Sequence, residues 1–134
     1  MMSDLIFVYG TLMLEATNSF ARQFHAQSTF LGKATWMGKL YQVIHYPGAV
    51  KSSNPDELIH GEIWQMKSPV VTLKMLDEYE ECSPTHPLPH EYLRSLENIK
   101  LNHNDVCAWV YIYQREISHL KHLKSGIFKH AQAK

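Results

Sequence analysis

Short runs of hydrophobic residues, separated by turn signals, predict a chain built mostly from β-strands. The first run covers residues 5–8 and stops at Tyr9-Gly10-Thr11-Leu12. Its length and composition are typical of a buried strand. Gly10 accepts backbone angles that other residues resist, so the strand can break there into a tight loop. Such a loop can direct several backbone N–H groups at one point and bind an anion or an oxyanion, although an ordinary turn fits the same spacing.

Two longer strands are expected next. Residues 26–41 carry large apolar residues but are interrupted by Gly32 and Gly38, which favours a long, bent strand with bulges over a helix. Residues 58–66 alternate between apolar and polar side chains after Gly61, as a half-buried strand does.

Turn signals divide the remaining β segments. Pro47-Gly48 indicates a turn, and the polar residues 52–57 are expected to form a hairpin loop. Residues 91–99 and 106–113 are rich in residues that favour strands, and the Asn102-His103-Asn104-Asp105 segment between them is expected to form a turn.

One clear helix is predicted to begin near residue 68. Ser68 suits the N-cap and Pro69 suits the first helical position. Leu73 and Leu76 then fall on one side and are expected to face the core. A second, shorter helix or a structured loop is expected within residues 13–25, where two phenylalanines lie four positions apart.

Length and composition indicate a single domain. The chain has 134 residues, of which 45% are hydrophobic, with three Trp, seven Tyr and five Phe, enough for a packed core. We expect one domain over residues 1–134, with its core at about 4–113. A basic tail would follow over residues 114–134, with a helical turn near 118–124 and mobile last residues.

The charge balance and the lengths of the apolar stretches bear on the partners and the location of the chain. Thirteen Lys and Arg balance thirteen Asp and Glu, which argues against a general nucleic-acid surface. A net charge near zero also eases self-association, which leaves a homodimer possible. No stretch approaches the ~20 apolar residues that a membrane span needs, and the N-terminus lacks the pattern of a signal peptide. We therefore expect a cytoplasmic protein.

Cysteine and histidine patterns predict neither a metal site nor a cofactor. Cys82 and Cys107 form no CxxC pair and are expected to be reduced thiols. Prolines between His86 and His90 prevent the helix that would align them. The His119 and His122 pair has no nearby Cys or carboxylate to complete a ligand set.

Five short motifs, in a fixed order, carry a family resemblance. They are Tyr9-Gly10-Thr11-Leu12, Tyr46-Pro47-Gly48, Gly61-Glu62-Ile63-Trp64, Leu76-Asp77-Glu78-Tyr79-Glu80 and Tyr92-Leu93-Arg94. In this order they resemble the gamma-glutamylcyclotransferase-like family (AIG2-like, YtfP-like). The resemblance covers roughly residues 4–113.

The resemblance implies an α+β fold, a compact mixed β-barrel with one main helix and short flanking helices. It also implies a transferase or lyase activity without a cofactor. The substrate would be a small γ-glutamyl-amine or γ-glutamyl amino acid with free α-amino and α-carboxylate groups. Its α-amine would attack its own γ-amide carbonyl, giving 5-oxoproline and a free amine. One carboxylate can carry the proton in such a reaction, and a partly apolar pocket would raise its pKa suitably.

The resemblance also assigns roles to residues. Glu80, the last residue of its motif, would be the catalytic base and acid, with Asp77, Glu78 and Glu81 as competitors. The substrate would be bound by the loop and by secondary positions: Tyr9, Gly10, Thr11, Leu12, Tyr46, Arg94 and Tyr111. On the residues alone, the acidic cluster also fits a solvated helix end, Tyr111 fits a packing residue, and Arg94 fits a structural ion pair.

The chain departs from the family pattern at two places. Glu81 stands where Gly is usual, and residues 82–90 form a long, proline-rich segment. A second acid beside the base would alter its pKa, and a long loop would narrow the cavity, so the substrate stays open. A non-catalytic metabolite-binding or protein-interaction module on the same fold is the alternative. Catalysis requires Glu80 to face the cavity lined by residues 9–12.

Overall fold

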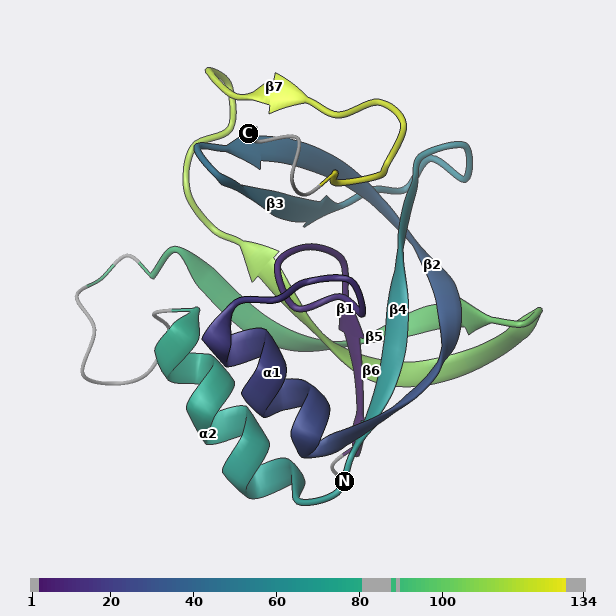
Figure 1. Ribbon diagram of the computed structural model, residues 1–134. Helices are drawn as coiled ribbons and strands as arrows, with labels where there is room; N and C mark the ends of the chain where they lie inside the picture. Colours follow the sequence, from purple (N-terminus) through teal and green to yellow (C-terminus); the bar gives the residue numbers. More distant parts are fainter. Residues whose placement is uncertain (1–2, 81–87, 89, 130–134) are drawn as a thin grey trace.

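The computed structural model describes residues 3–80, 88 and 90–129, and these fold into a closed five-stranded β-barrel with additional strands and two helices (Figure 1). This confirms the expected fold class. The elements in order are β1 Leu5–Val8, α1 Ser19–Ala26, β2 Ser28–Val43, β3 Tyr46–Lys51, β4 Leu58–Met66, α2 Pro69–Tyr79, β5 Tyr92–Leu101, β6 Asn104–Tyr113 and β7 Lys121–His122.

Strand β2 closes the barrel. The strands pair in the order β3-β2-β4-β1-β6-β5, and β2 also pairs with β5 through Ala34↔Leu101 and Thr35↔Lys100. The β1–β6 pair is parallel, with Ile6 opposite Trp109, and the other pairs are antiparallel. The barrel is therefore mixed, as expected.

The predicted bend in β2 is confirmed. Its register with β4 shifts between Phe30 and Gly32, and Gly32 has a φ of 153° that side chains rarely allow. The first part of β2 pairs with β4, and the part from Gly38 onward pairs with β3. One strand thus belongs both to the barrel and to the small sheet above it.

The turn predicted at Pro47-Gly48 is wrong. The chain turns at Ile44-His45, and Ile44 adopts a φ of 54°. Pro47 and Gly48 instead lie inside β3, opposite Gln42 and Tyr41. Strand β3 ends the pairing order, so the missing N–H of its proline is tolerated there.

Two further predictions are corrected. Residues 52–57 do not join a hairpin, because β3 and β4 each pair with β2 and have no described pairing with each other. The helical turn expected near 118–124 is replaced by β7, which pairs with Tyr41 and Gln42 of β2. The backbone edge of β2 supplies hydrogen-bond partners for the backbone of this segment. For example, the N–H of Leu123 donates to the Leu40 carbonyl over 2.7 Å.

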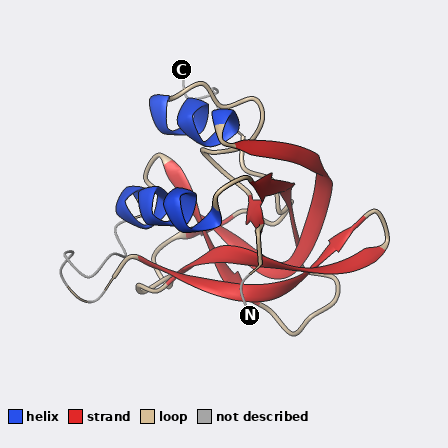
Figure 2. Cartoon of the chain, turned by 90° about the horizontal axis from the view of Figure 1, so that it is seen from below, coloured by secondary structure: helices blue, strands red, loops and turns tan. Residues whose placement is uncertain are grey.

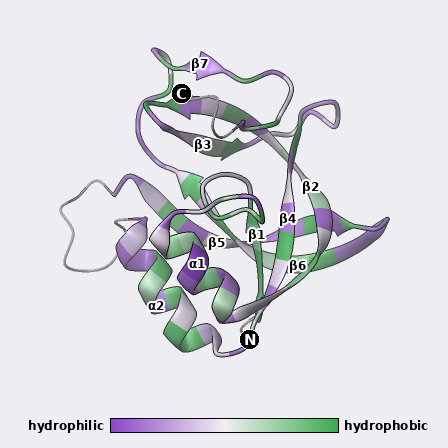
Figure 3. Cartoon of the chain, in the orientation of Figure 1, coloured by the Kyte–Doolittle hydropathy of each residue, from purple (hydrophilic) through white to green (hydrophobic). Residues whose placement is uncertain are grey.

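The core has two parts, one inside the barrel and one between its outer surface and the helices. Figure 2 shows both helices (blue) together with the strands (red). The predicted helices are confirmed, and Leu73 and Leu76 of α2 pack with Phe24 of α1 outside the barrel. Strand β1 is buried on both faces, which explains its unbroken apolar sequence (Figure 3). Neither helix could cross a bilayer, being too short and insufficiently apolar.

The β5–β6 turn generates a stability prediction. Asn102 and His103 connect the strands with φ values of 51° and 71°, as a type I′ turn requires, and Gly is preferred at the second position. His103→Gly should raise the free energy of unfolding by about 0.5–1 kcal/mol, measured by urea denaturation. His103→Ala keeps the strained Cβ and is the control. An equal gain from Ala would trace the effect to the imidazole instead.

Candidate active site

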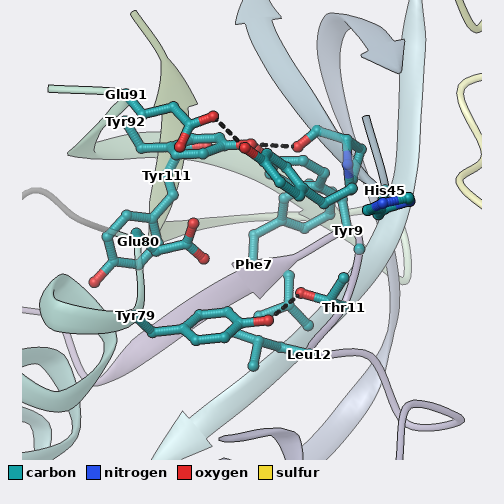
Figure 4. Close-up of a pocket in the computed structure, with 14 residues that line it drawn as sticks. Phe7, Tyr9, Thr11, Leu12, His45, Tyr79, Glu80, Glu91, Tyr92 and Tyr111 are labelled. Atoms are coloured by element: carbon teal, nitrogen blue, oxygen red, sulfur yellow. Dashed lines mark hydrogen bonds between the residues drawn. The ribbon is translucent and has the colours of Figure 1, made fainter. Parts of the chain in front are cut away.

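A cavity of ≈ 280 Å³ opens where β1 ends (Figure 4). Its walls come from five parts of the chain that are distant in sequence. They are residues 7–12, residues 45–47, residues 79–80, residues 91–92 and Tyr111. The volume lies just below the roughly 300–1,000 Å³ range of ligand pockets, so the cavity suits a small molecule or one part of a larger one.

The loop after β1 is held against two neighbouring elements. The Tyr9 hydroxyl donates to the Tyr111 carbonyl of β6 over 2.6 Å. A Cβ on Gly10 would lie 2.6 Å from Cγ of Pro47, so only glycine permits this approach to β3. His25 of α1 stacks on Trp64 and its Nε2 lies 2.9 Å from the Leu12 carbonyl oxygen. The loop is therefore preorganised.

The loop also offers uncommitted donors. Its carbonyls are used, since Gly10 accepts from the Met13 N–H and Thr11 accepts from the Asn18 side chain. Within the described part of the chain, no hydrogen bond takes up the N–H of Thr11 or Leu12. Both residues line the cavity. An anion in the cavity can therefore approach free amide groups.

Glu80 directs its carboxyl into the same cavity, on the side opposite His45 (Figure 4). It is the C-cap residue of α2, where its N–H still donates to the Leu76 carbonyl. Loss of hydration raises the pKa of Glu80 to about 8, and the charges of Glu91 and Asp77 add to this effect. Among the described residues none donates a hydrogen bond to its carboxylate. A carboxyl in this state can accept and return a proton near neutral pH.

Tyrosines form much of the remaining wall, and their hydroxyls already have partners. Tyr79 shares a hydrogen bond of 2.7 Å with Thr11, and Tyr92 donates to the Pro47 carbonyl over 2.6 Å. Burial raises the pKa of Tyr9, Tyr79 and Tyr92, and the charge of Glu80 contributes in each case. They therefore stay neutral and shape the cavity.

Arg94 does not line this cavity, in contrast to its expected substrate-binding role. Its Nε and Nη2 donate to the two oxygens of Asp77, each over 2.9 Å, and its guanidinium lies 4.5 Å from the ring centroid of Trp109. The hydroxyl of Tyr111, which does line the cavity, also donates to Asp77. Arg94 thus forms the structural ion pair that the sequence left open.

The structure thus brings Glu80 together with Tyr9, Gly10, Thr11, Leu12, Tyr46 and Tyr111 around one cavity. Of the competing acids, Asp77 is held by Arg94, and Glu78 is exposed and absent from the lining. Glu81, Cys82 and His86 lie outside the described residues. No group of three or more His, Cys, Asp or Glu among the described residues could hold a metal ion.

Comparison with known proteins decides the family. The family model "Gamma-glutamyl cyclotransferase, AIG2-like" matches residues 6–130. The chain belongs to this family. The gamma-glutamylcyclotransferase family protein YtfP of Escherichia coli K12 is 33% identical over 122 residues, covering 90% of this chain and 92% of that protein.

Solved structures agree in fold. The solution structure of YtfP from Escherichia coli has 31% identity and a TM-score of 0.64, covering 92% of this chain and 95% of that one. A crystal structure of an AIG2-like protein from Mus musculus has a TM-score of 0.69 at 22% identity, covering 94% and 88% of the two chains. The second likeness concerns the fold alone.

One of the motifs in this gamma-glutamyl cyclotransferase family chain does not line the cavity but supports the loop behind it. Glu62 of β4 is buried, and its Oε1 accepts hydrogen bonds from the Leu14 N–H over 2.7 Å and from Trp64 Nε1 over 3.0 Å. Trp64 in turn stacks on His25, which contacts the loop. The Gly-Glu-Ile-Trp motif therefore holds the chain that follows the cavity loop.

Seven residues that line the cavity were not predicted as site residues from the sequence: Phe7, Val8, His45, Pro47, Tyr79, Glu91 and Tyr92. Tyr79 precedes Glu80 and Tyr92 begins a family motif, so both carried a usable signal. Glu91 and His45 carried no such signal in the sequence. Their position at the cavity depends on which strand ends meet at the mouth of the barrel.

The ion pair behind Glu80 should stabilise the fold. Arg94→Gln leaves the half-buried Asp77 without its cation, so the free energy of unfolding should fall by about 1–3 kcal/mol. The double variant Asp77→Asn with Arg94→Gln should lose less than the sum of the two single variants in urea denaturation. Additive losses would contradict the pairing.

Glu80 should make stability depend on pH. The unfolded chain ionises it near its ordinary pKa of 4.5, whereas the folded chain keeps the proton until about pH 8. The folded state then binds more protons, so its stability falls as the pH rises between these values. At pH 8, the free energy of unfolding of Glu80→Gln should exceed that of wild type by about 1–3 kcal/mol, and the variant should unfold at a higher temperature. This gain should vanish near pH 4. A gain independent of pH would contradict the raised pKa.

Proposed function

We propose that this chain is a γ-glutamyl cyclotransferase that releases 5-oxoproline and a free amine from a small γ-glutamyl-amine or γ-glutamyl amino acid. The observation that carries the proposal is the position of Glu80. Its uncommitted carboxyl, with a raised pKa, lies in the same cavity as the free N–H groups of the loop after β1. The family membership supports the same reaction class.

The reaction needs a folded substrate and one proton carrier. The substrate's α-amine attacks its own γ-carbonyl carbon, forming the ring C–N bond, and the bond to the leaving nitrogen breaks. Glu80 takes a proton from the α-ammonium, and the attacking nitrogen gives up a second proton as the ring closes. Both protons end on the leaving nitrogen, which departs as an ammonium ion, so the Glu80 carboxylate is regenerated. Ring closure is intramolecular, and a cavity that fixes the folded conformer supplies much of the remaining acceleration.

The loop supplies the complementary charge recognition. The N–H groups of Thr11 and Leu12 are available to the substrate's α-carboxylate or to the oxyanion that develops on the γ-carbonyl. The loop is fixed by Pro47, His25 and Tyr111 before any substrate arrives, so its donors need no reorganisation. The cavity volume of ≈ 280 Å³ suits a group of the size of γ-glutamyl.

The test is the release of 5-oxoproline from a panel of γ-glutamyl compounds with different leaving amines. Wild type should turn over at least one of them, and Glu80→Gln should reduce kcat by about 10²–10⁴-fold, because proton transfer loses its carrier. Glu78→Gln is the matched control on the same helix and should retain activity.

The possible outcomes separate the alternatives. If folded Glu80→Gln retains turnover, the enzymatic activity stands, but another carboxylate must act as the base. Binding of panel compounds without turnover by wild type would favour a non-catalytic metabolite-binding module.

A further inference from the structure

The cavity holds a second carboxylate that the proposed reaction does not use. Glu91 precedes β5, lines the cavity, and lies near Glu80 on the wall away from His45 (Figure 4). None of the described lining residues is Lys or Arg, and Arg94 is engaged with Asp77. The cavity therefore has an acidic wall that calls for a cation.

Glu91 is also fixed in place. Its Oε2 accepts a hydrogen bond of 2.5 Å from the Tyr46 hydroxyl, and its backbone carbonyl accepts from the Gln114 N–H over 2.8 Å. Its other carboxylate oxygen accepts no hydrogen bond from a described residue. One oxygen of a positioned carboxylate is thus available to a ligand.

The two walls together match one kind of chemical group. Free amide donors of Thr11 and Leu12 lie on the loop, and the carboxylates of Glu80 and Glu91 come from the end of α2 and the residue before β5. A group with an anion and a cation on one carbon, the α-amino acid head of a γ-glutamyl compound, can satisfy both walls at once.

The geometry points to Glu91, held by Tyr46, as the residue that binds the α-ammonium of the substrate. This inference rests on the proposed function and divides the work between two carboxylates. Glu91 holds the ammonium as an ion, and Glu80 removes its proton. The Tyr46 hydroxyl, which donates to Glu91, fixes the direction of this carboxylate. Its charge also makes Glu80 a stronger base, since a neighbouring anion favours proton uptake.

The inference is tested by binding in a Glu80→Gln background, which prevents turnover. The probes are γ-glutamyl-methylamide and its deamino analogue, glutaric acid mono-methylamide, each titrated by calorimetry. Adding Glu91→Gln should weaken the first probe roughly 10- to 100-fold, because a charged hydrogen bond is lost. The deamino probe has no ammonium, so its affinity should stay within about two-fold. Both probes have a neutral methylamine portion, so a cation on the leaving amine plays no part.

Two further variants sharpen the experiment. Glu97→Gln removes the same charge from β5 at a residue that pairs with Lys51 outside the cavity, and it should change neither affinity. Tyr46→Phe removes the hydroxyl that positions Glu91 and should weaken the γ-glutamyl probe alone by a smaller factor. It tests the assignment independently if Glu91→Gln does not fold.

Each outcome has a distinct meaning. Equal weakening of both probes would show that Glu91 only supports the cavity wall, and unchanged affinity for γ-glutamyl-methylamide would also overturn the assignment. If wild type releases 5-oxoproline but either of these two binding results is found, only the assignment of Glu91 is wrong and the proposed function stands. If wild type releases none and neither probe binds, the proposed function fails and this inference fails with it.

Discussion

The pairing of β2 with both β4 and β5 is the constraint on which the rest of the structure depends. It closes the barrel, and closure places the end of β1, the start of β3 and the start of β5 around one opening. The glycine-dependent bend in β2 makes this possible, because a straight strand of 16 residues would leave the barrel instead of returning over it. The cavity is thus a consequence of one strand's register.

Local sequence patterns predicted the helices and strands well, but they did not predict how these elements contact one another. The apolar run of β1, the cap and proline of α2, and the alternation of β4 all depend on interactions within a few residues, so they could be recognised directly. The Pro47-Gly48 signal failed because β3 has an unpaired side where proline is tolerated, and closeness to Tyr113 explains the glycine. Closure of the barrel is a long-range property, and it was expected only from the family resemblance.

The site shows the same division. Glu80 and the loop after β1 were found because they belong to motifs, and the expected convergence on one cavity is present. Arg94 belongs to a motif as well, yet it faces Asp77 and Trp109. A motif therefore identifies residues that matter without separating those that contact a ligand from those that hold the frame. Glu91 lies in no motif, and only the three-dimensional structure places it at the cavity.

The contrast between Asp77 and Glu80 is the strongest physical argument for a role of the cavity. The two acids lie three residues apart at the end of one helix. Asp77 receives two hydrogen bonds from Arg94 and one from Tyr111, as a structural carboxylate should. Glu80 receives none from the described residues, loses hydration, and faces a second acid, all of which disfavour its ionised form. Stability alone would favour a neutral side chain at this position, so the unfavourable environment of Glu80 supports the proton-transfer role that we propose for it.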